Sequence, residues 1–144
     1  MNREEKDLLL KDLCARVNTN LVCSIYRTDD EGVGYRDEIL HGYCKGDIWY
    51  EFYFREDCSI GIDNVSKIKP YLLPISNMSD EQKEEYNRWK HEVPVCHYEY
   101  GDVVEEIELF DSPESFEYLI ENHFDINGLI EKGLAIDATG LNIY

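Results

Sequence analysis

The spacing of apolar residues divides the chain into a helical start, a β-rich middle and a largely helical end. In residues 2–17 the apolar positions recur at the spacing of one helical face, which predicts a first helix: Leu9 or Leu10, Leu13, Cys14 and Val17. Asn2 is the expected N-cap of this helix, with Glu5 three residues later completing a capping box.

Residues 21–62 alternate between apolar and polar side chains in short runs separated by polar turns, which predicts an antiparallel meander. The expected strands span residues 21–27, 35–43, 48–54 and 58–62, with turns near 29–34 and 45–47. The run at 48–54 gives the strongest strand signal, because large rings occupy both of its faces. One face holds Ile48, Tyr50, Phe52 and Phe54, and the other holds Trp49, Glu51 and Tyr53.

The second half continues with a helix and two strands. Residues 63–74 contain two prolines, which favour a short helical turn followed by an extended segment. Ser79 and Gln82 form the expected capping box of a polar helix that runs to about residue 90. Residues 93–100 and 103–110 predict two strands joined by a tight turn at 101–102, and Pro94 places the first of them at a sheet edge.

Residues 110–137 hold the densest core-type pattern. Asp111 or Ser112 is the expected N-cap of a helix whose inward face consists of Phe116, Leu119, Ile120, His123 and Phe124. Asp125 is expected to cap a second, shorter helical segment that ends at Gly133, and residues 134–136 are a candidate buried strand. His123 and Asp125 are either parts of the folding pattern or a functional pair, and the second interpretation requires the helix to break at residue 124.

These elements predict an α+β fold in a single domain, residues 1–144. We expect a twisted, mainly antiparallel sheet of about five or six strands, with three or four helices packed mostly on one face.

Charge narrows the classes of partner. The chain has 14 Lys and Arg against 31 Asp and Glu, a net charge of −17. Such a surface repels nucleic-acid phosphate and anionic membranes and favours basic partners, including proteins with a basic groove. Acidity that serves solubility alone is the competing interpretation. The charged N-terminal segment does not resemble a signal peptide and no long apolar run is present, so we expect a cytoplasmic protein.

Catalytic and metal-binding patterns are absent from the sequence. It contains no P-loop, no G-x-G-x-x-G and no G-x-S-x-G, so we predict no enzyme activity and no cofactor. The five cysteines form no C-x-x-C pair and are expected to be reduced thiols. Cys96 and His97 are adjacent on a strand and so face opposite sides, and no metal site is predicted. Glu106 and Glu108 share a strand face at about 7 Å, a spacing more typical of a solvated sheet than of a catalytic cleft.

The aromatic strand is the best candidate binding surface. If its Phe52 face packs on the helices, the opposite face leaves large side chains for a partner: Trp49, Glu51 and Tyr53, with Tyr43 from the neighbouring strand. Alternatively, helices or a second copy of the chain cover this face. His123 and Asp125 are secondary candidates.

Three blocks of the sequence resemble an uncharacterised family of small proteins carried by phages and prophages of gut bacteria: LLLKDLCARV at 8–17, IDNVSKIKPYLLPISNMSDEQKEEY at 62–86 and NHFDINGLIEKGLAID at 122–137. The chain has Leu73, Asn122 and Asn127 where the family pattern has Arg, His and Arg, so basic groups are missing here. The resemblance implies an accessory protein of a phage or mobile element, acting inside a bacterial host.

The expected function is therefore non-enzymatic binding to a host protein, as a counter-defence factor. Two alternatives stay open: a protein that binds or sequesters a small molecule such as a nucleotide signal, and an acidic nucleic-acid mimic that inhibits its target.

Overall fold

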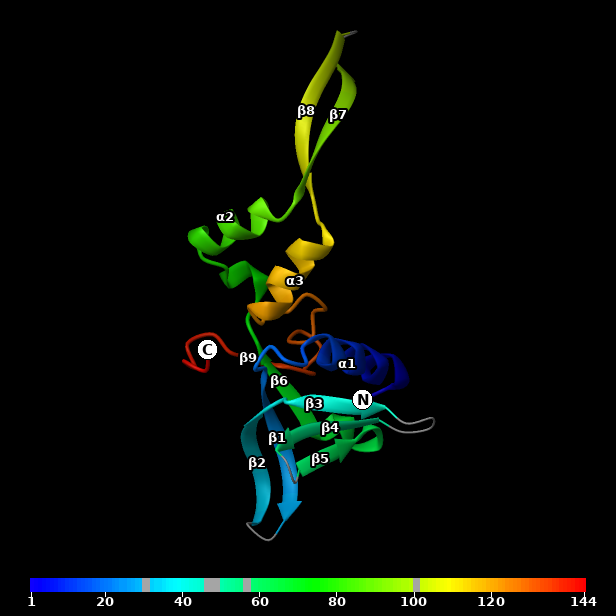
Figure 1. Ribbon diagram of the computed structural model, residues 1–144, viewed down its shortest axis with the longest axis vertical. Helices are drawn as coiled ribbons and strands as arrows, with labels where there is room; N and C mark the ends of the chain where they lie inside the picture. The colour runs from blue at the N-terminus through cyan, green and yellow to red at the C-terminus, as the bar shows by residue number, and fades with distance from the viewer. Residues whose placement is uncertain (30–31, 46–49, 56–57, 100–101) are drawn as a thin grey trace.

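The computed structural model describes residues 1–29, 32–45, 50–55, 58–99 and 102–144. The molecule is elongated (Figure 1). One end is a body of two sheets and helix α1, two further helices lie in the middle, and a two-stranded hairpin projects at the far end. The fold is α+β, as the sequence predicts, with three α-helices among the described residues. The predicted turns at 29–34, 45–47 and 101–102 fall partly outside them.

The body holds two sheets. The first has the strand order β2 (Gly32–Ile39), β1 (Val22–Asp29), β6 (Ile68–Leu72), β9 (Ile136–Asp137). Its neighbours are antiparallel except β6 and β9, which are parallel. The second sheet is antiparallel and consists of β3 (Gly42–Lys45), β4 (Tyr50–Arg55) and β5 (Cys58–Gly61).

The predicted single sheet of five or six strands is thus divided. The division occurs at residues 40–41, inside the run that the sequence predicts as one strand. The Leu40 N–H donates to the Leu21 carbonyl of the first sheet at 2.8 Å, and the His41 N–H donates to the Tyr53 carbonyl of the second, also at 2.8 Å. The chain therefore passes from one sheet to the other between two consecutive residues.

Helix α1 (Arg3–Ala15) packs on the body and closes its core. The capping box between Asn2 and Glu5 is present, as predicted. The helix turns Leu9 and Leu13 inward, where they meet buried side chains of both sheets and of the C-terminal segment, among them Ile25, Phe52, Phe54, Leu72 and Leu129.

A second, smaller buried cluster lies under α2 (Asp80–Arg88) and α3 (Pro113–Glu121): Met78, Tyr118, Leu119 and Phe124. These two helices pack on each other, away from the body sheets (Figure 1), so the expected arrangement of helices on one sheet face is wrong. Two 3-10 turns flank β6: η1 (Ile62–Lys67) lies in the body beside α1 and β5, and η2 (Ile75–Asn77) leads into the part that holds α2 and α3.

The three α-helices of the described chain begin at N-caps that the sequence predicts. The Ser79 hydroxyl accepts from the Gln82 N–H at 3.2 Å, which confirms the predicted box of α2. In α3 the N-cap is Ser112, whose box partner is Ser115 at the third helical position. Phe116 is 46% exposed, so its predicted place on the inward face is wrong; Ser115 and Tyr118 are buried instead. Phe116 lies instead on the side of α3 toward the end of α1, where it lines an open hollow of about 410 Å³ with Val17 and Ile120.

Residues 125–135 form turns where a second helical segment was expected. Asp125 does act as a cap, because its carboxylate accepts from the Leu129 N–H at 2.8 Å and the Ile130 N–H at 2.9 Å. Gly133 has a φ of +69°, the left-handed conformation that the C-cap prediction required. The predicted strand at 134–136 is displaced to Ile136–Asp137, which pairs with β6 as β9.

A buried ion pair joins the two parts of the molecule. Arg16 and Asp12 are almost fully buried, and the guanidinium Nε donates to Asp12 Oδ2 at 2.8 Å. The same guanidinium donates to the Ile120 carbonyl at 3.1 Å and the Phe124 carbonyl at 2.7 Å, while the Asn127 amide donates to Asp12 at 2.8 Å. Arg16 therefore ties α1 to the end of α3.

The helices of the described chain are all too short or too polar to span a membrane.

Candidate interaction surfaces

The projecting hairpin consists of β7 (His91–Glu99) and β8 (Asp102–Phe110), which we call the arm. The two strands pair with each other over nine positions and with no other strand of the described chain. An isolated two-stranded sheet is only marginally stable in water. Within the described residues, the arm therefore has two edges without a neighbouring strand and two faces that no other strand covers.

The two faces of the arm differ in chemistry. Directly opposite residues of antiparallel strands share a face, and the register pairs Pro94 with Ile107 and Glu92 with Leu109. This aliphatic face also contains Val103, and its apolar side chains are well exposed: Ile107 69%, Val103 58% and Leu109 45%.

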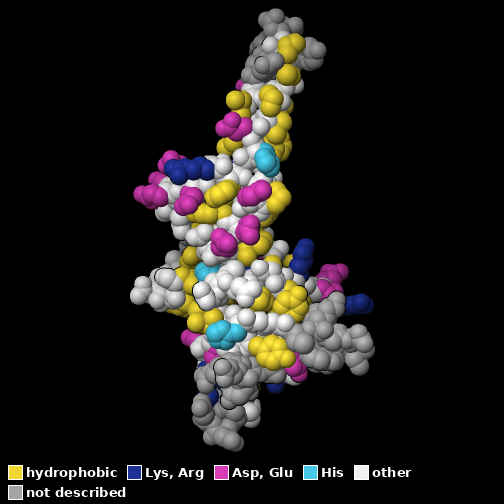
Figure 2. Space-filling model, viewed as in Figure 1, with side chains coloured by type: hydrophobic (Ala, Val, Ile, Leu, Met, Phe, Trp, Pro, Cys, Tyr) yellow, Lys and Arg dark blue, Asp and Glu magenta, His cyan; other side chains and the backbone are white. Residues whose placement is uncertain are grey.

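The opposite face, the glutamate face, carries Glu106 and Glu108 opposite Val95 and Val93. Hydrophobic side chains line the visible side of the arm, and acidic side chains gather over α2 and α3 (Figure 2). Ile107 and Leu109 are neighbours on the aliphatic face, and exposed apolar neighbours of this kind are typical of a surface that another molecule covers.

The base of the arm is held by contacts between its two ends. Lys90 Nζ lies 3.3 Å from Asp111 Oδ1, and these residues immediately flank the two strands. The Tyr86 hydroxyl donates to the same Asp111 oxygen at 2.6 Å, and Lys90 Nζ lies 4.5 Å above the Tyr86 ring. The Ser112 hydroxyl donates to the Trp89 carbonyl. These bonds fix the arm to α2 and α3.

These contacts perturb two titrations at the base. Burial, with the hydrogen bond to Asp111, raises the pKa of Tyr86 to about 12. The hydrogen bond from Tyr86 lowers the pKa of Asp111, and Lys90 lowers it further. Asp111 is therefore ionised at neutral pH, as its ion pair with Lys90 requires.

An acidic hollow of about 400 Å³ lies beside the base of the arm, between α2 and α3. Its lining consists of four glutamates around a tryptophan, a tyrosine and an asparagine: Glu85, Glu114, Glu117, Glu121, Trp89, Tyr118 and Asn122. Trp89 is 48% exposed. No Lys or Arg lines this hollow, so it favours cationic groups.

The negative charge of this region is visible in the sequence. From residue 91 to residue 131 the chain has 12 Asp and Glu and not a single Lys or Arg. This stretch contains the whole arm and α3. The net charge of −17 is therefore strongly concentrated at the arm end of the molecule.

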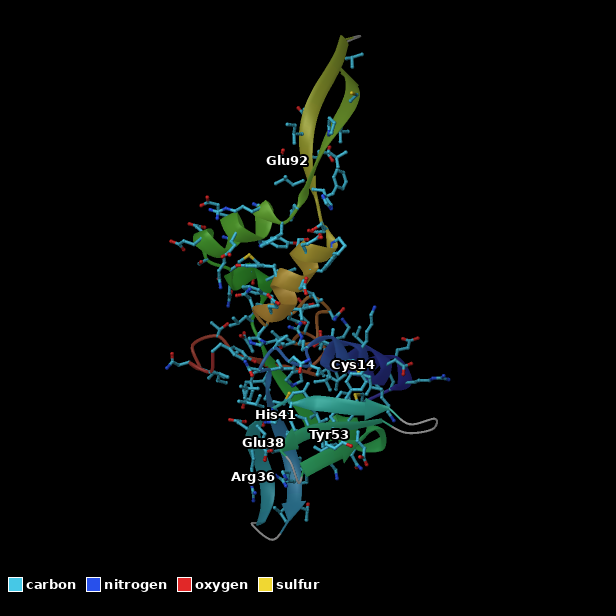
Figure 3. The ribbon with its side chains drawn as sticks, viewed as in Figure 1. Cys14, Arg36, Glu38, His41, Tyr53 and Glu92 are labelled. Carbon is cyan, nitrogen blue, oxygen red and sulfur yellow. The ribbon has the colours of Figure 1, made fainter. Side chains whose placement is uncertain are left out.

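The aromatic strand lies in the body, far from the arm, as the labels of Tyr53 and Glu92 show in Figure 3. Phe52 and Phe54 are buried, as predicted, and Glu51 and Tyr53 on the other face are half-buried and joined by a hydrogen bond of 3.3 Å. Tyr43 is paired opposite Phe52 and so shares the packed face, with ring centroids 6.3 Å apart. Trp49 lies outside the described residues. The predicted aromatic surface thus divides between two faces.

His123 and Asp125 do not act on each other. Helix α3 does end before them, but Asp125 bonds to the backbone of residues 129 and 130, and the His123 ring stacks on Tyr144 at 3.9 Å. His123 is buried with a φ of +60°, and its Nδ1 lacks a hydrogen-bond partner. Burial lowers the pKa of His123 to about 4, with a further contribution from the Arg16 charge. Both residues belong to the junction, the segment 120–127 whose groups bond to Arg16 and Asp12 of α1.

Other chemistry-bearing groups stay apart. Among the described residues, no three His, Cys, Asp or Glu side chains come together as metal ligands. Cys14, Cys23 and Cys96 form no disulfide. Glu106 and Glu108 share one strand face, as predicted, and both are exposed on the arm.

Sequence reasoning found both strands of the arm but missed its isolation and the hollow beside it. The sequence signal for this region is the long run without Lys or Arg, which coincides with the arm and α3.

Comparisons with protein-family models, curated proteins and solved structures find no match to this chain. The resemblance to the phage family therefore stays a prediction.

Proposed function

We propose that this protein acts by non-enzymatic binding to another protein and that the arm is its principal contact. One observation carries the proposal: the projecting hairpin exposes Val103, Ile107 and Leu109 on one face, and no other element of the described chain packs on that face. Apolar side chains presented on a narrow, projecting element become buried when a partner encloses the element.

The arm is a better contact than the aromatic strand. Tyr53 and Glu51 already bond to each other, and Tyr43 packs toward Phe52. Ile107 and Leu109 stay 69% and 45% exposed although they lie opposite Pro94 and Glu92. The contact energy of a partner is therefore expected to come mainly from the arm.

The class of partner that we propose is a host protein with a basic surface, and specifically a component of bacterial antiphage defence. The resemblance to phage and prophage proteins supports the host context. The net charge of −17 supports the basic surface, since like charges on a partner would oppose association.

Capture of a partner from a lysate of the host bacterium tests the proposal. Wild-type protein is compared with the double variant Val103→Thr/Ile107→Thr, which keeps β-branched side chains suited to a strand but removes apolar surface. Burying the exposed parts of these two residues is worth about 1 to 2 kcal/mol each. We therefore expect at least about a tenfold loss of affinity for the captured protein.

Val33→Thr is the matched control, because Val33 is an equally exposed strand residue on β2, far from the arm. It should capture the partner as the wild type does, and circular dichroism should show all three proteins folded. Equal capture by the arm variant and the wild type contradicts the proposal. So does repeated failure of the wild type to retain any specific protein.

A further inference from the structure

We infer that the outer edge of β8 accepts an extended basic segment of the partner as a third strand of the arm. This inference rests on the proposed function and names the chemistry of the partner at that same arm. It follows from the two edges, from the side chains of β8 and from the local charge.

The two edges of the arm are not equivalent. Each outer edge presents unpaired backbone N–H and C=O groups, which is how a strand from another chain is bound. Pro94 in β7 has no N–H, and a strand proline sits where its nitrogen faces away from the ladder, so the β7 edge lacks a donor. Residues 102–110 of β8 contain no Pro, so each keeps its N–H, and the charged residues of this strand are all acidic, which deters another acidic strand but not a basic one. β8 is the open edge.

The side chains of β8 define which segment fits beside it. Glu106 and Glu108 point to the glutamate face, and Ile107 and Leu109 to the aliphatic face. A strand added at this edge places its own side chains next to these in the same alternation. A segment that alternates Lys or Arg with aliphatic residues therefore matches both faces at once.

Charge decides between a basic partner and a second copy of the chain. Pairing β8 with β8 of another copy would place glutamates of both chains on the same narrow sheet, which is unfavourable. The absence of Lys and Arg between residues 91 and 131 leaves no cation on the arm to offset this repulsion. A cationic segment is the complementary occupant.

The test uses a fluorescently labelled peptide, acetyl-Lys-Val-Lys-Val-Lys-Val-Lys-amide, and the full-length protein at physiological salt. Binding is measured by fluorescence anisotropy. Two further peptides carry N-methyl groups, one on the valine nitrogens and the other on the central lysine nitrogens. Alternate N–H groups of a strand point to opposite sides, so only one of the two sets faces β8. We expect one methylated peptide to bind like the parent and the other to lose at least about tenfold in affinity.

Protein variants locate the binding on β8. Glu106→Gln/Glu108→Gln should weaken binding of the parent peptide about three- to tenfold, by removing two cross-strand charge pairs. Glu4→Gln/Glu84→Gln changes the net charge by the same amount at exposed helical sites outside the arm and should have little effect. Equal effects of the two pairs, or equal binding of both methylated peptides, would mean attraction by overall charge and would overturn the inference.

The outcomes also separate this inference from the proposed function. If the Val103→Thr/Ile107→Thr protein loses its cellular partner but wild-type protein binds no peptide, the arm is a binding element and strand addition is wrong. If the peptide binds β8 as described but the arm variant captures the cellular partner fully, the edge is competent and the proposed function fails. A concentration-dependent doubling of mass that Glu106→Gln/Glu108→Gln strengthens would identify a second copy as the occupant and would also overturn the inference.

Discussion

Replacing Arg16 with methionine removes the charge that holds α1 to the end of α3. Methionine keeps a long apolar stem in the site but leaves the Asp12 carboxylate, which is 1% exposed, without its cation. It also leaves the Ile120 and Phe124 carbonyls without the guanidinium donors at 3.1 and 2.7 Å. In Arg16→Met, the Asn127 amide still donates to the Asp12 carboxylate.

The expected magnitude follows from the burial of both partners. Breaking a buried ion pair by removing one partner costs about 3 to 5 kcal/mol, because an uncompensated charge stays in the interior. A domain of this size has a free energy of unfolding of about 5 to 15 kcal/mol, so Arg16→Met should remove a large part of it.

The double variant Asp12→Leu/Arg16→Met tests the cause of this loss. It removes the stranded carboxylate, so it should recover about 2 kcal/mol relative to Arg16→Met alone. It should stay below the wild type, since the two carbonyls and the Asn127 amide still lack partners. Urea denaturation followed by circular dichroism gives all the free energies of unfolding by linear extrapolation. A loss below about 1 kcal/mol for Arg16→Met, or a double variant less stable than either single variant, would refute this reasoning.

Three further predictions concern the junction, the base of the arm and a helix cap. Folding lowers the pKa of His123 from 6.5 to about 4, so between these pH values the unfolded chain binds a proton that the folded chain does not. From pH 7 to 4.5 the wild type should therefore lose about 2 kcal/mol of stability relative to His123→Asn, and a pH-independent difference in urea denaturation would contradict this. Tyr86→Phe removes the hydrogen bond that lowers the pKa of Asp111, so the carboxyl titration of Asp111 seen by NMR should move to higher pH; an unmoved titration would count against the described contact. Ser79→Ala should cost about 1 kcal/mol in thermal or urea denaturation, through loss of the cap of α2, whereas the exposed Ser76→Ala should cost little.

Local features of the fold could be predicted from the sequence because their causes are local. The boxes at Asn2–Glu5 and Ser79–Gln82 need only residues three apart, and the alternation of residues 103–110 needs only a strand. The sequence offers Asp111 and Ser112 as caps of α3, and the cap is Ser112, whose hydroxyl also donates to the Trp89 carbonyl 23 residues away.

Features that depend on long-range pairing could not be predicted. The sequence pattern predicts that Tyr43 shares a sheet face with Tyr53, but the face of Tyr43 is set by its pairing with Phe52, which no local pattern shows. The burial of Arg16 depends on carbonyls more than 100 residues later in the chain. The isolation of the arm is likewise a fact about which strands find partners. Its two strands were visible in the sequence, but the absence of a third strand beside them was not.

The length of the arm gives its base a mechanical importance. Nine residues at about 3.4 Å each make a lever of about 30 Å, so a rotation of about 10° at the base moves the tip by about 5 Å. The contacts of Asp111 with Lys90 and Tyr86 set the direction of this lever. Loosening them would let the tip sweep a wider volume, while a partner that held the tip would then have to restrict more motion. The rigidity of the base therefore sets both the volume that the tip can reach and the entropy lost when a partner binds it.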